Sequence, residues 1–276
     1  MSKNYTIFER DYDIINSMKA LWKGNISFAL LNIPVKLYGA SHKRDISFHL
    51  LHKKCSTPLH YERYCPTCKA DVDWEDTTHG YEYEKDKFVV VTDEEIEHIP
   101  IKTSKSIDIL RFIDAKEIES IYYDKSYYLE PVEGGERAYA LLRDTIKETG
   151  KVALAKISFK NREHITIIKI FHDILMLQTL LYADEIVKPE TLNIPKKIAL
   201  DEKELSLSTE LLRHFIGKFN INSYHDEFRD SLMELIKAKI AGKEIKVAPR
   251  KEAEKIVSLM DALKKSLSGG VKKKAV

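Results

Sequence analysis

A long series of short apolar or alternating segments between Trp22 and Leu181 constrains the fold of this chain more than any other feature. Clear examples are Lys151–Phe159, Glu163–His172 and Ile174–Leu181, which are separated by turn residues. This pattern predicts β-strands rather than helices. Because the strands follow one another closely, they predict a meander, closed or strongly curved into an antiparallel barrel. With 43% hydrophobic residues, the chain can bury a substantial core, which argues against wholesale disorder.

Further strands and two helices are predicted within the same region. The other strands are expected at Ile26–Leu31, Val35–Tyr38, Gly80–Val91 (a hairpin turning at Lys85-Asp86), Ser106–Asp114 and Ser126–Val132. Thr92–His98 starts with a threonine followed by acids, which favours a helix N-terminus. Glu136–Thr149 has apolar residues at helical spacing and stops at Gly150, which predicts a second helix.

The chain becomes helical after the loop Pro189–Pro195. Asp201–Phe219 and His225–Ala241 each place apolar residues near one face, so we expect an arm of two amphipathic helices. No internal repeat is evident. The expected fold is mixed but mainly β, and the predicted organisation is an N-terminal extension (1–17), a barrel core with a bridge (18–200), the helical arm (201–242), and a linker, short helix Glu252–Leu267 and basic tail (243–276).

Three cysteines lie within one short segment and predict a metal site. Cys65-Pro-Thr-Cys68 is one hook, and His52-Lys-Lys-Cys55 is a second. Three thiolates and one imidazole at this spacing are typical of a tetrahedral Zn²⁺. We expect the ligands His52, Cys55, Cys65 and Cys68 on one hairpin (49–68), with His49 and His60 as alternatives to His52. Four protein ligands would leave no open position for substrate, so such a zinc would be structural.

Two other interpretations of the cysteines remain open. They could be reduced thiols in a hairpin, with His52 on the surface. A thioredoxin-like redox pair at Cys65 and Cys68 lacks the expected βαβ context and leaves Cys55 without a role. An odd cysteine count fits a secreted disulfide framework poorly, so we expect a reducing cytoplasm. No apolar run is long enough to span a membrane, and the N-terminus lacks the order of a secretory signal.

The net charge of +2 conceals a strongly segmented distribution. From Lys19 to Lys69 there are nine basic and two acidic residues, a balance of +7. From Asp71 to Glu136 there are nineteen acids and seven bases, a balance of −12, and Lys243 to Val276 has ten bases and four acids, a balance of +6. A surface built from the first segment could bind phosphates, unless neighbouring segments mix in space and cancel.

Sequence motifs for catalysis are not found. There is no Gly-x-x-x-x-Gly-Lys-Ser/Thr, Gly-x-Gly-x-x-Gly, Gly-x-Ser-x-Gly or His-Glu-x-x-His pattern. Because many active sites assemble from distant residues, this lowers the expectation of an enzyme without excluding one.

Several blocks resemble the prokaryotic Ku proteins of non-homologous end joining. The segment Ala20–Tyr38 is similar to the opening of that family, and Gly80–Glu95 is similar to its central hairpin and helix. Tyr182–Glu185, Ile236–Lys243 and Leu259–Ser266 are similar to further blocks. The resemblance covers about residues 18–267 in the family's order. Residues 1–17 precede the usual start, and a long Lys-rich C-terminal extension is reduced to Lys272–Lys274.

The resemblance implies a specific architecture and function. It implies a Ku-type β-barrel with bridging strands and a C-terminal helical arm, in a ring-shaped homodimer threaded by a double-strand DNA end. It also implies that the arms clasp the other subunit, and that Leu259, Met260 and Leu263 in the short terminal motif recruit a polyfunctional ATP-dependent DNA ligase. Such a protein would be non-enzymatic and would work in the cytoplasm, at the nucleoid.

Seven basic residues are our candidates for contacting the DNA backbone. They are Lys23, Lys36, Lys43, Arg44, Lys53, Lys54 and Arg63. A ring retains DNA by topology, so phosphate contacts without base readout would suffice. Two alternatives stay open. One is a metal-dependent nuclease that uses the carboxylates of 71–136 as Mg²⁺ ligands, and the other is a zinc-stabilised protein-interaction module.

Overall fold

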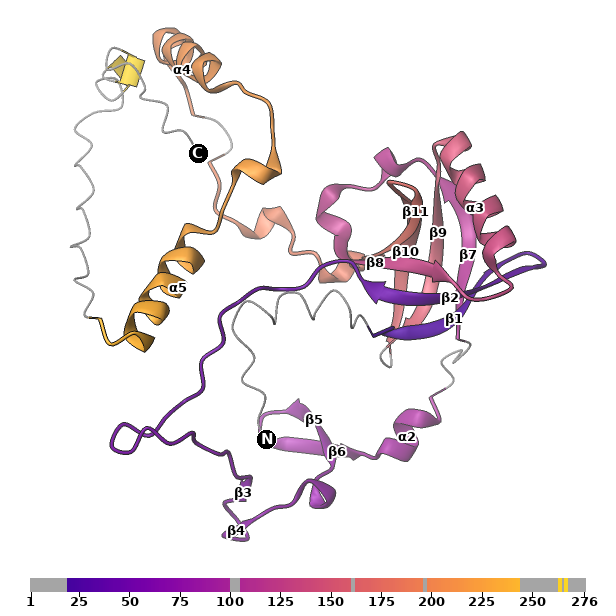
Figure 1. Cartoon of the computed structure of the whole chain (residues 1–276), viewed down its shortest axis with the longest axis vertical. Coiled ribbons are helices and arrows are strands. Elements are labelled where there is room, and N and C mark those ends of the chain that lie inside the picture. Colours follow the sequence, from indigo (N-terminus) through magenta and orange to yellow (C-terminus); the bar gives the residue numbers. More distant parts are fainter. Residues whose placement is uncertain are drawn as a thin grey trace. The chain divides into compact units, whose positions relative to one another are not determined.

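The structure, a computed structural model, describes residues 19–99, 105–159, 162–195, 198–243, 263–264 and 266–267. The described chain divides into two compact units. The larger unit, which ends at Pro189, contains a β-barrel and two small two-stranded sheets. The smaller unit comprises the short segment Asp45–Phe48 and the chain from Glu190 onward, and it contains two helices of the C-terminal region. Figure 1 shows the elements of both units along the chain.

Seven strands close into the barrel (Figure 1). Their order around the barrel is β1-β2-β8-β11-β10-β9-β7. Their bounds are β1 Trp22–Phe28, β2 Leu31–Gly39, β7 Ser106–Ile113, β8 Tyr123–Pro131, β9 Val152–Phe159, β10 Arg162–Phe171 and β11 Ile174–Leu180. The barrel confirms the predicted fold class. The strands do not form a simple antiparallel meander, however, because β1 pairs with β7 in parallel and β8 lies between β2 and β11.

Alternating burial along β2 and along most of β9 contributes to the barrel core. On β2, Ile33, Val35 and Leu37 are buried while the residues between them are more exposed. Successive side chains of a strand point to opposite faces, so one face of β2 fills the interior. The same alternation on β9 buries Ala153, Ala155 and Ile157 in the same cluster. This interior is packed with aliphatic side chains, which is typical of a small barrel.

Helix α3 (Glu136–Thr149) packs against the barrel and joins its core. Tyr139, Leu142 and Ile146 are its buried residues, at the spacing of one helical face. The Tyr139 hydroxyl donates to the Leu129 carbonyl oxygen and accepts from the Leu175 N–H, both at 2.8 Å. One phenol therefore links the helix to two neighbouring strands. Gly150 ends the helix in the left-handed conformation, with φ 63°.

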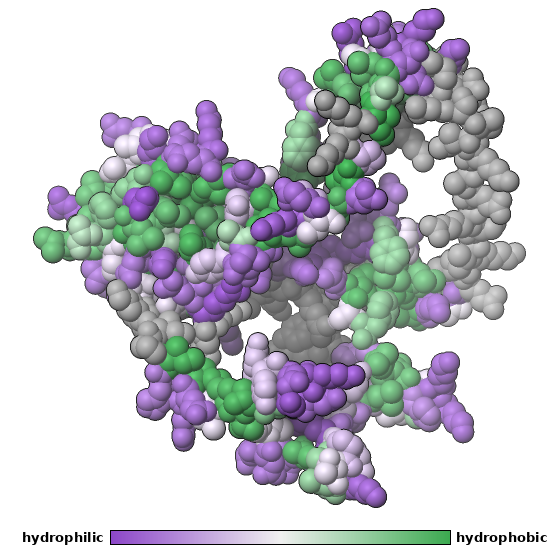
Figure 2. Space-filling view, turned by 180° about the vertical axis from the view of Figure 1, so that it is seen from behind, coloured by the Kyte–Doolittle hydropathy of each residue, from purple (hydrophilic) through white to green (hydrophobic). Residues whose placement is uncertain are grey.

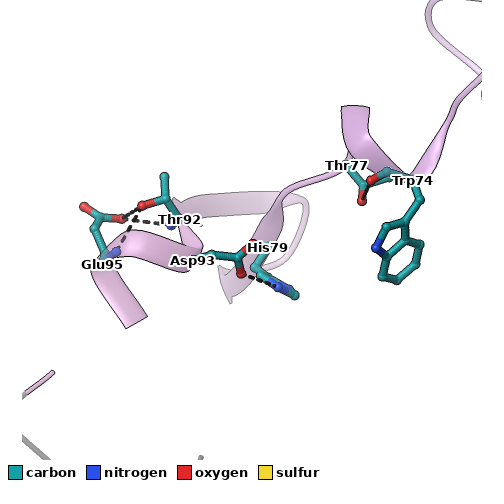
Figure 3. A network of polar contacts seen from close by, with 6 residues as sticks. All are labelled: Trp74, Thr77, His79, Thr92, Asp93 and Glu95. Atoms are coloured by element: carbon teal, nitrogen blue, oxygen red, sulfur yellow. Dashed lines mark hydrogen bonds and ion pairs between the residues drawn. The ribbon is translucent and has the colours of Figure 1, made fainter. Parts of the chain in front are cut away.

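Two small sheets and a short helix lie between β2 and β7 in the sequence. The first sheet pairs β3 (Tyr64–Cys65) with β4 (Ala70–Asp71), and the second pairs β5 (His79–Glu84) with β6 (Lys87–Val91). Helix α2 (Asp93–Glu97) follows. Its start is fixed by reciprocal hydrogen bonds between Thr92 and Glu95 (Figure 3). A polar contact of 3.2 Å between His79 Nε2 and Asp93 Oδ1 joins β5 to this helix (Figure 3).

The second unit carries helices α4 (Glu202–Phe215) and α5 (Glu227–Ile240). Both start at an aspartate whose side chain accepts a backbone N–H, Asp201 for α4 and Asp226 for α5. Neither helix buries a residue, and apolar side chains are open to view on the arm in Figure 2. Both predicted helices are confirmed, although α4 ends at Phe215, four residues before the expected Phe219.

Short 3₁₀ turns complete the described elements: Trp74–Asp76, Ala115–Glu117, Ser120–Tyr122, Ala183–Glu185, Pro189–Thr191 and Ile221–Ser223. The expected N-terminal extension lies outside the described residues, as does most of the expected helix Glu252–Leu267. None of the helices in the described ranges is long and apolar enough to cross a membrane.

Candidate nucleic-acid interface

Lys23 and Lys36 face each other across the β1–β2 pair. They are cross-strand partners in its register. Lys36 lies between the buried residues Val35 and Leu37, so its side chain belongs to the outer surface of the barrel. Two like charges directly opposite each other destabilise a strand pair unless an anion or acid offsets them. This pair is therefore suited to a surface that receives phosphate.

An acid on the next strand partly offsets this charge. Glu130 on β8 is the cross-strand partner of Lys36, and their side chains form an ion pair of 3.4 Å. The Tyr38 hydroxyl donates to the same Glu130 carboxylate at 2.7 Å. This hydrogen bond and the neighbouring ammonium lower the pKa of Glu130, so the carboxylate is charged at neutral pH. Sequence reasoning missed Tyr38 and Glu130, because no local signal joins residues so far apart.

The next candidates leave the barrel directly after β2. Lys43 and Arg44 are exposed residues of an extended segment. The Nε of Arg44 lies 3.4 Å from Nε2 of His42. Neither Lys43 nor Arg44 forms an ion pair within the described ranges. Both can therefore contact an external anion.

The last three candidates lie beside the predicted metal ligands. Lys53 and Lys54 are exposed and occupy the turn between His52 and Cys55. Arg63 immediately precedes β3, and its guanidinium lies over the ring of Trp74, 4.6 Å from the centroid. The Trp74 ring contacts the face of the Arg63 guanidinium, so the guanidinium N–H groups can still donate to a phosphate. The structure thus groups the candidates as a pair on the barrel, a pair after β2 and three on the following hairpins.

The predicted zinc ligands come together as two pairs. His52 Nδ1 lies 3.2 Å from Cys55 Sγ, and the backbone N–H of Cys68 donates to Cys65 Sγ at 3.5 Å. Hydrogen bonds from the backbone and side chain of Cys68 lower the pKa of Cys65, while the side-chain hydrogen bond with Cys65 and the charge of that thiolate raise the pKa of Cys68. Within the described ranges, no three His, Cys, Asp or Glu side chains lie close enough together to hold a metal ion. The first pair lies in a hairpin closed by the bridge between Leu51 and Pro58, and the second pair lies in the β3–β4 hairpin. The two ligand pairs therefore occupy two hairpins, and the expectation of a single hairpin is wrong.

Several acids of segment 71–136 serve local structure. Glu95 and Asp114 accept N–H groups at helix starts, and Glu84 pairs with Lys87. The predicted ligase-binding residues are only partly described. Leu259 and Met260 lie outside the described residues, while Leu263 lies in a helical stretch that is described.

The structure is that of a β-barrel protein with two lysines opposite each other on the outer surface of the barrel. Comparison with known families shows to which family of β-barrel proteins the chain belongs. Residues 27–207 match the model of the Ku70/Ku80 beta-barrel domain. This match covers more than half of the chain. The chain therefore belongs to the Ku family.

Several relatives carry the name non-homologous end joining protein Ku. The protein of Archaeoglobus fulgidus is 38% identical over 91% of this chain and 98% of its own length. The protein of Bacillus subtilis is 32% identical over 91% of this chain and 82% of its own length. The protein of Symbiobacterium thermophilum is 37% identical over 92% of this chain, but the chain spans only 63% of that relative's length.

Proposed function

We propose that this chain binds the ends of double-stranded DNA in non-homologous end joining, without reading base sequence. The observation that carries the proposal is a Ku-family barrel with Lys23 and Lys36 in register on its outer surface. Lysines bind phosphate as point charges and carry no base preference of their own. A protein that must accept any broken end needs this kind of contact. We assign it no catalytic step.

The protein would act as a ring-shaped homodimer. Large apolar side chains on the arm support this, since Leu205, Leu212 and Phe215 on α4 are 57%, 62% and 64% exposed. On α5, Phe228 is 76% exposed. Monomers rarely leave so many apolar side chains in water, and burial across a two-fold axis would remove them. A two-fold axis would also present every basic contact twice, on both sides of the DNA.

The C-terminal region would recruit an ATP-dependent DNA ligase. This part of the proposal rests on the family's short terminal motif and on Leu259, Met260 and Leu263 within it. The site of action would be the cytoplasm, at the nucleoid. A binding assay between the ligase and a variant with Leu263→Asp would test the assignment, with an unchanged DNA affinity as its control.

A gel-shift comparison tests the end-binding itself. Linear duplex is compared with the same duplex closed into a circle, with and without Mg²⁺. We expect binding to the linear form alone and no cleavage, because a ring must be loaded over an end. Equal binding to both forms would contradict the ring.

The same assay decides between the alternatives. Cleavage that requires Mg²⁺ would favour a nuclease. No shift with either DNA would favour a protein-interaction module. A binding constant that falls with salt at a slope of about −0.9 per phosphate neutralised would support backbone contacts.

A further inference from the structure

The segment that carries the cysteines is built from two copies of one small hairpin, and this repeat is visible in the hydrogen bonds. In the first copy, Leu59 N–H donates to Leu50 O at 2.9 Å, and Leu51 pairs with Pro58. In the second copy, Val72 N–H donates to Arg63 O at 2.7 Å, and Tyr64 pairs with Asp71. Each position of the second copy lies 13 residues after its counterpart (50 and 63, 51 and 64, 59 and 72).

The turn at the tip of each hairpin repeats in the same way. Ser56 N–H donates to His52 O, and Lys69 N–H donates to Cys65 O, both at 2.8 Å. Ser56 and Lys69 are two of the five described non-glycine residues with positive φ, at 54° and 53°. This conformation is unfavourable for a serine or lysine, and its occurrence at equivalent places indicates a common constraint. The expectation that the chain has no internal repeat is therefore wrong.

Each turn places its two metal-ligating side chains together. The hydrogen bond from the fifth residue to the first closes each turn, so the first and fourth residues belong to the same tight turn. His52 and Cys55 hold these positions in one copy, and Cys65 and Cys68 hold them in the other. His52 Nδ1 and Cys55 Sγ are 3.2 Å apart. Ligands around a tetrahedral Zn²⁺, at about 2.0–2.3 Å from the metal, are separated by roughly 3.5 Å. The first pair is thus already near the required spacing.

The two hairpins have no hydrophobic core of their own. Between residues 49 and 76, all of which the structure describes, no side chain is buried. Apolar residues of this stretch are open to water, such as Leu50 at 62% and Tyr61 at 84% exposed. Elements this small need a metal or another cross-link when burial cannot hold them together.

We propose that one structural Zn²⁺ joins the two hairpins through the ligand positions of both turns: His52 (by Nδ1), Cys55, Cys65 and Cys68. Binding would close the two preformed pairs onto one ion. The short chain segment between the hairpins is long enough to allow this, because an extended chain spans about 3.3 Å or more per residue. The backbone N–H of Cys68, which donates to Cys65 Sγ, would stabilise the Cys65 thiolate when the metal is bound.

The metal also has a consequence for DNA binding, which rests on the proposed function. Lys53 and Lys54 lie inside the first turn, and Arg63 starts the second hairpin. Joining the hairpins would fix these three cations relative to one another. Phosphate contacts gain from such ordering, because less side-chain and loop freedom is lost on binding. Zinc removal should therefore weaken binding of linear duplex and leave the barrel folded.

The first test is the metal content of the full-length chain, expressed and purified without a His tag. We expect about one zinc per chain. After chelation, titration with Co²⁺ alone should produce the visible spectrum of a tetrahedral thiolate-bound ion. Chain that holds no zinc and gives no such spectrum would overturn the proposal. So would a Cys65–Cys68 disulfide in the freshly purified, metal-free chain.

Variants test the ligand assignment against matched neighbours. His52→Asn and Cys65→Ser each remove a ligand, so they should lower zinc affinity by more than the roughly 10–100-fold typical of changing a group that only hydrogen-bonds to a ligand. His49→Asn and His60→Asn should keep wild-type affinity. Zinc loss in either of these two, with full affinity in His52→Asn, would overturn the choice of His52. If Cys65→Ser does not fold, the Co²⁺ titration of the wild-type chain still decides the question.

The outcomes for zinc and for DNA can be told apart. Zinc at full stoichiometry without end-binding would contradict the proposed function and leave the metal site standing. End-binding by a chain that holds no zinc would do the reverse. Equal DNA affinity of the zinc-loaded and chelated chains would contradict the claim that zinc orders the three basic residues for DNA binding.

Discussion

Lys36 on β2 and Glu130 on β8 are cross-strand partners, and their side chains form an ion pair of 3.4 Å on the outer surface of the barrel. Lys23 lies on the other side of Lys36 in the same row. Glu130 therefore offsets part of the positive charge that the β1–β2 pair presents to an anion. The two members of the ion pair should affect DNA binding in opposite directions.

Lys36→Glu should weaken binding to linear duplexes of all sequences about equally. The substitution removes a cation that would neutralise a phosphate, and it leaves two acids adjacent. Titrations over a range of salt concentrations should show a slope that is smaller by about one for each phosphate that the variant no longer neutralises. Wild-type affinity in this variant would contradict the placement of the DNA along this row.

Glu130→Gln should strengthen DNA binding, because it removes the acid that pairs with Lys36 while keeping an acceptor for the Tyr38 hydroxyl. The same salt titration measures the effect. Glu133→Gln, at an exposed acid that follows β8, provides a control for the removal of one negative charge. Equal gains in both variants would show that total charge, and not this row, sets the affinity.

Tyr139→Phe should destabilise the barrel. The hydroxyl bridges Leu129 O and Leu175 N–H, and all three residues are buried. Its removal leaves both backbone groups without this partner, at a cost of about 1–3 kcal/mol. Urea unfolding measures the change, and Tyr64→Phe, at an exposed tyrosine, should leave stability unchanged.

Glu185 should contribute stability that disappears in acid. Its carboxylate accepts the Tyr182 N–H and the Arg162 guanidinium, each at 2.7 Å, and these interactions lower its pKa. A folded-state pKa below the unfolded one means that this contribution is complete above the ordinary value of 4.5 and disappears as pH falls through the folded value.

Urea unfolding of wild type and Glu185→Gln at a series of pH values tests this. The difference in unfolding free energy should be largest near neutrality and should shrink below pH 4.5. Glu190→Gln, at an exposed site, serves as the matched control for the removal of one carboxylate. A pH-independent difference for Glu185→Gln would rule out the linkage.

Leu212→Asp should convert the proposed dimer to a monomer. Leu212 is 62% exposed on α4, one heptad after Leu205, so it lies on the apolar stripe proposed to face the other subunit. Sedimentation at micromolar concentration should give the mass of one chain, against two for wild type. Glu210→Gln on the same helix should remain dimeric, and a wild-type chain that is monomeric would refute the interface.

Local signals predicted several elements almost to the residue. The helix Glu136–Thr149 and the hairpin turn at Lys85-Asp86 agree with the structure. A glycine that ends a helix, and the hydrophobic periods of two residues for strands and 3.6 for helices, involve only a few neighbouring residues. They can therefore be recognised directly in the sequence. The strand order could not be predicted. The parallel pairing of β1 with β7 depends on closure of the whole barrel.

The candidate site, too, was predictable from the sequence only in part. The cysteine and histidine spacing indicated the zinc ligands, but the two-hairpin repeat is recorded in backbone hydrogen bonds and positive φ angles, which residue types do not reveal. The basic segment likewise identified Lys23 and Lys36. Their direct opposition follows from the strand register.

Composition and short-range periodicity were enough to predict the mainly β fold, the helical arm and the concentration of positive charge before residue 70. The resemblance to the Ku family came from particular sequence blocks, such as Ala20–Tyr38 and Gly80–Glu95. Which charge each lysine meets follows instead from the folded arrangement of the strands. Lys36 and Glu130 are 94 residues apart in the chain, and strand pairing in the barrel brings them into contact. A one-residue slip in that register would send every side chain of a strand to the opposite face. The outward row formed by Lys23, Lys36 and Glu130 therefore exists only in the closed barrel.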